Sequence, residues 1–188
     1  MRRVKRFQIA PIQAQQGFTL VELVTVVIVL GILALVIIPR FTSNSGFVEY
    51  ALQKRFMASL RNIQLKAMYD TRSDFCYKIN LVLGNTSSAS FGPSTTNYVS
   101  GNHIASCGTA VDISSPLYLR TQAGEINAND ITFTAQDSGA AITYVQFDNI
   151  GRAYTSAGTC ATGCTFTFTG QSSAQVCIAD QGYVYACE

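Results

Sequence analysis

An uninterrupted apolar run near the N-terminus constrains this chain more than any other feature. It extends over 21 residues, from Phe18 to Ile38, close to the ~20 residues that a helix needs to cross the hydrocarbon core of a bilayer. Glu22 is the only ionisable side chain in the run. An acid in the middle of a membrane helix costs about 2.5–3.5 kcal/mol on insertion scales. The run therefore predicts a spanning helix whose single carboxylate has a function.

The segment before the run is basic and ends in a glycine. Residues 1–17 contain no acid and carry four basic side chains, Arg2, Arg3, Lys5 and Arg6. A cut after Gly17 leaves a new α-amine on Phe18, with an ordinary pKa near ~8. An opposite charge within about 4–6 Å favours the ionised form of both partners. We therefore hypothesise that this amine pairs with Glu22 of a neighbouring subunit and sets their register.

An ordinary secretory signal or a simple single-pass anchor is the alternative interpretation. An ordinary signal has a shorter apolar core that is followed by a small-residue cleavage site. Here the candidate cut precedes the apolar run. This order favours a helix that stays in the mature protein.

The stretch from Gly17 to Glu22, GFTLVE, resembles the class III signal of type IV pilins and pseudopilins. Gly31 and Pro39 also lie where that family has a helical glycine and a proline. The resemblance implies cleavage after Gly17 by a prepilin peptidase, N-methylation of Phe18, and packing of the helix into a filament core, with Glu22 and Pro39 as assembly residues. The implied partners are other pilin subunits and an inner-membrane pilus assembly platform.

The chain divides into three expected parts: a removed leader over 1–17, a transmembrane and filament-core helix over 18–46, and a globular domain over 47–188. Basic residues on one flank orient a membrane helix with that flank in the cytoplasm. The domain is then periplasmic while the protein sits in the inner membrane, and extracellular once the subunit joins a pilus. Because four of the 13 basic residues lie in the leader, the mature chain is slightly acidic.

All six cysteines follow the apolar run: Cys76, Cys107, Cys160, Cys164, Cys177 and Cys187. An even number in an oxidising compartment predicts three disulfides. Sequence proximity favours 76 with 107, 160 with 164 and 177 with 187, and a nested arrangement of the last four stays open. A metal site built on Cys160 and Cys164 needs thiolates, so we expect no metal and no cofactor.

The globular part predicts an α+β fold, with the long N-terminal helix laid on an antiparallel β-sheet. Phe47 to about Asp70 is expected to be helical, because apolar residues recur in steps of three and four: Leu52, Phe56, Leu60, Ile63 and Ala67. Basic side chains on its other face are expected in solvent, or against acidic surfaces of neighbouring subunits. Alternating segments predict strands: Tyr77–Leu83, Leu117–Leu119, Ile131–Ala135, Ile142–Phe147, Thr165–Thr169, Gln175–Ala179 and Tyr183–Ala186.

Turns and loops punctuate these segments. Residues 148–151 and 180–182 have the composition of hairpin turns. The stretch from Gly84 to Gly108 is rich in Ser, Thr, Gly and Asn and lacks apolar periodicity, which predicts a surface loop. Such a loop offers a place for adhesion contacts, although a plain connection is the simpler interpretation. At Pro39 the missing backbone donor predicts a kink or a loosened turn.

Further resemblances suggest a particular kind of subunit. The residues from Pro39 to Phe41, from Ser45 to Tyr50 and from Gln64 to Met68 look like minor pilins of mannose-sensitive haemagglutinin (MSHA) pili. The segments 145–152 and 176–184 are similar to minor pseudopilins of type II secretion. These resemblances imply a low-abundance subunit that primes assembly and serves surface attachment, with a secretion pseudopilin as the alternative.

Enzymatic and nucleic-acid functions are disfavoured by the residues. The chain has one histidine, and no glycine-flanked nucleophile or paired catalytic acids, so acid–base chemistry lacks its usual partners. A DNA-binding tip pilin needs clustered Lys and Arg. Beyond Arg72 the basic residues are Lys78, Arg120 and Arg152, against eight acids. We therefore expect no catalysis and weak affinity for nucleic acid.

Overall fold

The computed structural model describes residues 18–42, 46–69, 77–97 and 106–187, with side chains for 18–34, 46–69, 77–95 and 107–187. Two compact units divide the chain, residues 1–43 and 44–188, and each is described by itself.

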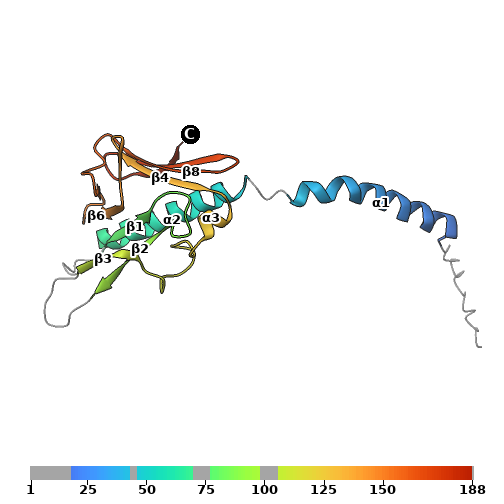
Figure 1. Ribbon diagram of the computed structural model, residues 1–188, viewed down its shortest axis with the longest axis horizontal. Helices are drawn as coiled ribbons and strands as arrows, with labels where there is room; N and C mark the ends of the chain where they lie inside the picture. Colours follow the sequence, from blue (N-terminus) through green and yellow to red (C-terminus); the bar gives the residue numbers. More distant parts are fainter. Residues whose placement is uncertain (1–17, 43–45, 70–76, 98–105, 188) are drawn as a thin grey trace, which may run out of the picture. The chain divides into compact units, whose positions relative to one another are not determined.

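The first unit contains a single described helix, α1 (Leu20–Thr42; Figure 1). Helical backbone continues through Pro39 to Thr42. In the described part of the chain, no helix combines the length and the apolar character that a membrane crossing requires.

The second unit starts with α2 (Val48–Tyr69), which packs on strands of two sheets (Figure 1). The predicted apolar stripe is confirmed, because Leu52, Phe56, Leu60, Ile63 and Ala67 are all at most 4% exposed. Phe56 lies at the centre of the core. Its ring centroid is between 4.9 and 5.9 Å from the rings of four phenylalanines contributed by both sheets: Phe91, Phe133, Phe166 and Phe168.

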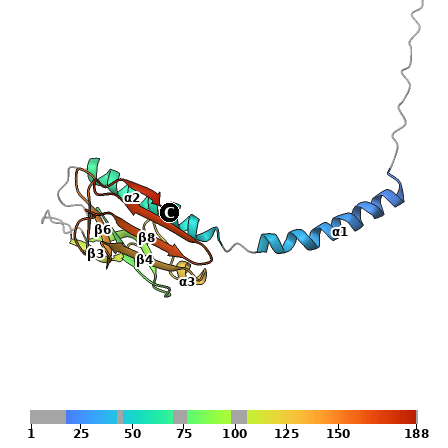
Figure 2. The ribbon, with the colours of Figure 1, turned by 90° about the horizontal axis from the view of Figure 1, so that it is seen from above.

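Two five-stranded antiparallel sheets follow α2, where the sequence predicted one. The first has the order β3-β2-β1-β6-β7 and the second has the order β10-β9-β8-β4-β5 (Figures 1 and 2). The strand bounds are β1 Lys78–Val82, β2 Ser90–Asn97, β3 Ser106–Val111, β4 Thr132–Asp137, β5 Ala140–Ala141, β6 Tyr144–Phe147, β7 Ala153–Thr155, β8 Cys164–Thr169, β9 Ser173–Ile178 and β10 Val184–Cys187. The α+β class is therefore observed.

The prediction of a surface loop from Gly84 to Gly108 is wrong over most of its described length, because β2 and the start of β3 lie there. β2 pairs with β1, and β3 pairs with β2, while 98–105 lies outside the described residues. Phe91 is fully buried and is the only large apolar side chain of β2. Main-chain pairing does not depend on side-chain alternation. A polar, glycine-containing segment therefore joined a sheet that its periodicity did not predict.

The strand expected at Leu117–Leu119 is also wrong. These residues form a turn in which the Leu119 amide donates to the Pro116 carbonyl at 2.9 Å. Leu119 is 4% exposed, whereas Leu117 is 49% exposed, so the two leucines do not share a buried face as a strand of a sheet requires. A four-residue helix, α3 (Glu125–Ala128), and the short strands β5 and β7 were not predicted. Elements this short carry too few residues for a periodic signal.

Both predicted hairpin turns are confirmed by the antiparallel pairs β6–β7 and β9–β10. The two turns meet on α2. The Gln64 side-chain amide donates to the carbonyls of Gly151 and Gly182, at 2.7 Å in each case. One helix side chain thereby ties together hairpins from different sheets.

Two disulfides lie in the second sheet's strands and loops. Cys160 bonds Cys164 and Cys177 bonds Cys187, the pairs that sequence proximity favours over the nested arrangement. Cys107 is also disulfide-bonded, and Cys76 lies outside the described residues. The second bridge joins β9 to β10, which is the edge strand of its sheet.

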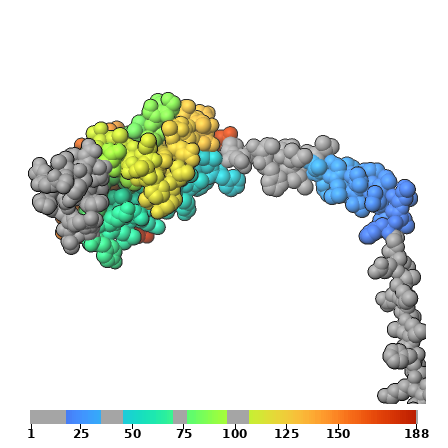
Figure 3. All heavy atoms as spheres, turned by 90° about the horizontal axis from the view of Figure 1, so that it is seen from below, coloured from blue at the N-terminus to red at the C-terminus, as the bar shows by residue number. Residues whose placement is uncertain are grey.

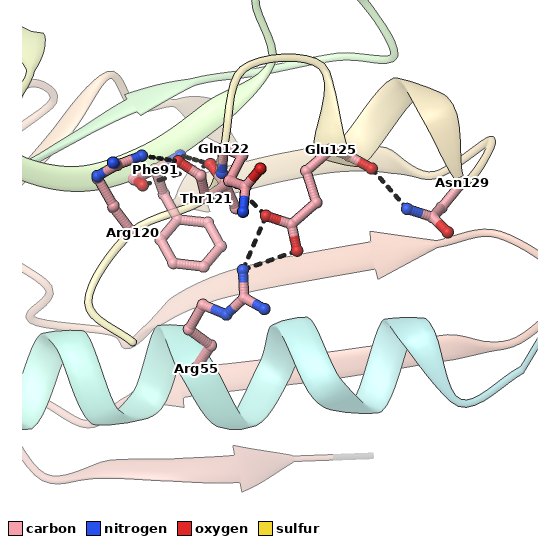
Figure 4. Close-up of polar contacts among 7 residues, drawn as sticks. All are labelled: Arg55, Phe91, Arg120, Thr121, Gln122, Glu125 and Asn129. Carbon is pink, nitrogen blue, oxygen red and sulfur yellow. Dashed lines mark hydrogen bonds and ion pairs between the residues drawn. The ribbon is translucent and has the colours of Figure 1, made fainter. Parts of the chain in front are cut away.

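The expected solvated basic face of α2 is only partly observed. Arg55 forms an ion pair with Glu125 of α3, in which Arg55 Nη1 donates to both carboxylate oxygens, at 2.7 and 2.8 Å (Figure 4). Arg61 donates to the Val184 carbonyl at 2.8 Å. Figure 3 shows the yellow-to-orange segment that contains α3 lying beside α2. Periodicity separates a helix's faces, but it does not say which neighbours border the polar one.

Glu49, in the first turn of α2, is a buried carboxylate that fixes the β8–β9 turn. Its Oε1 accepts from the Ser172 amide at 3.0 Å, and its Oε2 is buried without a hydrogen-bond partner among the described residues. Burial by itself raises the pKa of Glu49, but backbone amides of Ser172, Glu49 and Gln171 and the Ser172 hydroxyl outweigh it, so the pKa is lowered. The folded state therefore favours the ionised carboxylate.

This shift predicts a specific loss of stability in acid. A carboxyl whose pKa is lower in the folded than in the unfolded state contributes stability above its unfolded pKa, and that contribution disappears as the pH falls through the folded pKa. Below about pH 4.5 the unfolding temperature should drop, and Glu49→Gln should flatten that drop. Thermal unfolding of the full chain in mild detergent, from about pH 7 to pH 3.5, measures it. The control is Asp180→Asn, an exposed turn carboxylate; an unchanged acid slope in Glu49→Gln would contradict the assignment.

Candidate functional site

Thr19 caps the N-terminal end of α1. The Thr19 hydroxyl accepts a hydrogen bond from the Glu22 amide at 3.2 Å, and the Thr19 carbonyl accepts from the Leu23 amide at 3.2 Å. Thr19 is thus the N-cap, and Glu22 occupies the third helical position. A Thr N-cap typically contributes about 1 kcal/mol to helix stability.

This geometry gives Glu22 a local role that our sequence reasoning missed. A carboxylate in the first turn interacts favourably with the helix dipole, by about 0.3–1 kcal/mol at an exposed site. The signal was present in the sequence, because Thr19 and Glu22 have the spacing of a capping box. Thr25, one turn later, donates its hydroxyl to the Glu22 carbonyl at 2.9 Å. Hydrogen bonds to threonine hydroxyls therefore fix both the amide and the carbonyl of Glu22.

Every described side chain from Phe18 to Ala34 is exposed. Phe18 is 84% exposed, and the described valines, leucines and isoleucines from Leu20 to Leu33 are between 45% and 80% exposed. A helix that is apolar all round is normally buried among other helices or in lipid. A continuous exposed apolar surface of this kind marks an interaction site. The described part of α1 therefore presents an apolar surface that suits lipid or other apolar helices.

The predicted site residues fall into two groups. Phe18 and Glu22 lie together at the start of α1, and Glu22 forms no ion pair with another described residue. Gly17 and the rest of the leader lie outside the described residues, as does the side chain of Pro39. The described cysteines belong to the other unit, where they crosslink strands and loops.

Asp137, Cys160 and Cys164 are the one described group with metal-ligand atoms, all within 4.8 Å of one another. Zinc binds cysteine as the thiolate, whereas these two sulfur atoms are bonded to each other. Asp137 Oδ2 also accepts from the Thr155 hydroxyl at 2.8 Å. In this structure the three residues therefore have a structural role: the cysteines form a buried disulfide, and Asp137 accepts a hydrogen bond beside it.

Residues 12–38 match the family model of the prokaryotic N-terminal methylation motif. The chain carries this methylation motif. The motif spans the candidate cut after Gly17, the Phe18 amine and Glu22, and it continues through most of α1. The matched range includes the Thr19 cap and all the exposed side chains of residues 18–34.

Two solved structures are similar to the chain that carries the motif. Both are crystal structures of the type IV minor pilin FimU from Pseudomonas aeruginosa strain PAO1. The P21 form has a TM-score of 0.46 and 14% sequence identity, and the alignment covers 78% of this chain and 92% of FimU. The P65 form has a TM-score of 0.41 and 14% identity, with 72% and 90% covered. No curated protein matches the chain significantly.

Proposed function

We propose that this chain is a minor pilin, a low-abundance subunit of a type IV pilus. The observation that supports the proposal is that a methylation motif over residues 12–38 overlaps a capped helix whose described apolar side chains are all exposed. Such a helix is stable inside lipid or inside a bundle of similar helices. A pilin uses both environments in turn.

In this proposal the precursor waits in the inner membrane with its leader in the cytoplasm and its C-terminal domain in the periplasm. A prepilin peptidase cuts after Gly17, and Phe18 is N-methylated. The helix then moves from lipid into the filament core, guided by the assembly platform. Because lipid is as apolar as the helix bundle, this transfer gains little hydrophobic free energy.

The charge pair therefore governs register in the proposed mechanism. The Phe18 amine of an entering subunit meets the Glu22 carboxylate of a neighbour. The Thr19 cap supports this role because it holds the Glu22 amide and keeps the first turn of α1 formed. In apolar surroundings an opposite charge at close range favours the ionised state of both groups.

The finer part of the proposal concerns the kind of filament. We place the subunit in an MSHA-like pilus, where it primes assembly and contributes to surface attachment. The segments that support this lie around Pro39 and in residues 45–50 and 64–68. Pseudopilins share the N-terminal chemistry, so the filament in which the protein is found decides between the two functions.

The test is mass spectrometry of filaments sheared from cells that express the chain. We expect a protein that begins at Phe18, carries one extra methyl group on its amine, and co-purifies with pilus subunits. Finding the intact leader on filament protein, or finding the apolar segment removed, would refute the proposal. Recovery from a secretion pseudopilus alone would favour the alternative function.

Replacing Glu22 separates assembly from processing. We expect Glu22→Val to be cleaved and methylated normally but to be depleted from filaments by tenfold or more, roughly the effect of losing 1.4 kcal/mol or more of pairing energy. Immunoblots of sheared filaments and membranes measure the ratio. Glu22→Asp is the matched control, because it also changes the side chain at position 22 and leaves the charge. Normal incorporation of Glu22→Val would contradict the charge-pair mechanism.

A further inference from the structure

A long seam runs between α2 and the β9–β10 hairpin in the second unit, where Figure 2 shows α2 beside the red C-terminal strands. Two hollows open along this seam. One, of about 640 Å³, is lined by Tyr50 and Lys54 of α2 and by the ends of β9 and β10. The other, of about 430 Å³, is lined by Arg61, Leu65 and Met68 and by both hairpin turns.

The α2 residues that line the hollows form a second stripe. Tyr50, Lys54, Arg61, Leu65 and Met68 recur at helical spacing on the side away from the core stripe, and all five are exposed. We call these five residues the outer face of α2. Side chains three, four or seven apart share one side of a helix. The outer face is therefore a continuous surface.

Apolar side chains from the hairpin turns extend this surface. Ile150 is 59% exposed and Tyr183 is 67% exposed, and both line the same hollow as Leu65 and Met68. The Tyr183 ring stacks on the Tyr185 ring with centroids 5.5 Å apart. Gln64 fixes both turns by its two hydrogen bonds. The surface is therefore pre-organised, which lowers the entropic cost of binding a partner.

The charge on the outer face has one sign. α2 carries four basic side chains and one acid, and that acid, Glu49, is buried. Arg55 is paired with Glu125, whereas Lys54 forms no ion pair with a described residue. Lys54 and Arg61 are seven residues apart, which is about 10 Å along the helix axis. A complementary partner needs carboxylates at that spacing around apolar side chains.

We infer that the outer face of α2 docks an acidic, apolar surface of a different subunit in the same filament. This inference rests on the proposed pilin function and adds the partner surface that the globular domain uses. Charge decides between a different subunit and a second copy joined by the same face. Two copies joined through this face bring Lys54 and Arg61 of each against those of the other, and like charges oppose such a contact.

A photoreactive benzophenone amino acid at Leu65 tests the docking in cells that assemble filaments. We expect a crosslinked adduct in which mass spectrometry identifies another filament subunit. The same amino acid at Lys66, the next residue, is the control, because Lys66 lines neither hollow. We expect little or no adduct there. Non-reducing gels of the membrane fraction confirm that both variants fold.

The charge part has its own test. Lys54→Glu should lower incorporation into filaments about fivefold, and Lys66→Glu, the same charge reversal on the same helix, should leave it near the wild-type level. In the partner subunit identified by crosslinking, replacing the acidic residue that faces Lys54 with Lys should restore incorporation of the Lys54→Glu variant. Equal incorporation of both variants would overturn the charge complementarity.

The possible outcomes distinguish failure of the docking surface from failure of the proposed pilin function. If wild-type protein is absent from filaments, the proposed function fails. If wild-type protein is present in filaments but the Leu65 variant gives no adduct, the docking surface fails while the proposed function stands. An adduct with a second copy, or with a protein outside the filament, overturns the assignment of the partner.

Discussion

Replacing Gly17 with tryptophan is expected to abolish processing of this protein. In the proposed mechanism the peptidase cuts directly after position 17, and a bulky side chain there replaces a residue that has none. The precursor then keeps its basic leader, the Phe18 amine never forms, and Glu22 has no charged partner. Filament incorporation should fall below detection. Gel mobility and N-terminal sequencing of membrane protein read out the result.

Gly31→Trp is the control for this prediction. It introduces the same side chain into the same motif, and a Cβ at Gly31 meets no atom within 4 Å. Cleavage should therefore be normal in that variant. A mature-sized band from Gly17→Trp would show that the cut lies elsewhere.

The second large effect is expected at Gly182, in the β9–β10 turn. Its φ is +86°, a backbone conformation that L-residues adopt at a cost. A Cβ there falls on the Gly151 carbonyl oxygen and lies 3.0 Å from the Gln64 side-chain nitrogen. Gly182→Ala should therefore separate the two hairpin turns and lower the free energy of unfolding by about 3 kcal/mol or more.

Gly139→Ala separates the steric part of this effect from the conformational part. Gly139 has the same φ of +86°, but a Cβ there meets nothing within 4 Å. It should cost only about 1–2 kcal/mol, the ordinary penalty for a left-handed residue. Thermal or denaturant unfolding of the full chain in mild detergent compares the two. Equal losses would mean that the close approach to the Gly151 carbonyl contributes nothing.

Alternation and periodicity predicted the elements that bury a full stripe or face. The core stripe of α2 and the buried pair Phe166 and Phe168 in β8 came from spacing alone. β2 is too polar and α3 is too short to show such a pattern. β2 is stabilised by pairing with β1 and β3, and α3 by the ion pair of Glu125 with Arg55. The candidate site was predicted at Phe18 and Glu22, and the Thr19 cap was overlooked although its spacing was visible.

The sequence by itself determined the chemistry of the N-terminal segment: a basic leader, a candidate cut, one acid and an apolar helix. These properties are local, because they depend on residues close together in the chain. Only the tertiary structure decided that two sheets share one aromatic core, that Gln64 joins two hairpin turns, and that Arg55 of α2 pairs with Glu125 of α3. These contacts join residues far apart in the chain, 87 and 118 positions in the case of Gln64, and neither spacing nor composition specifies such a contact.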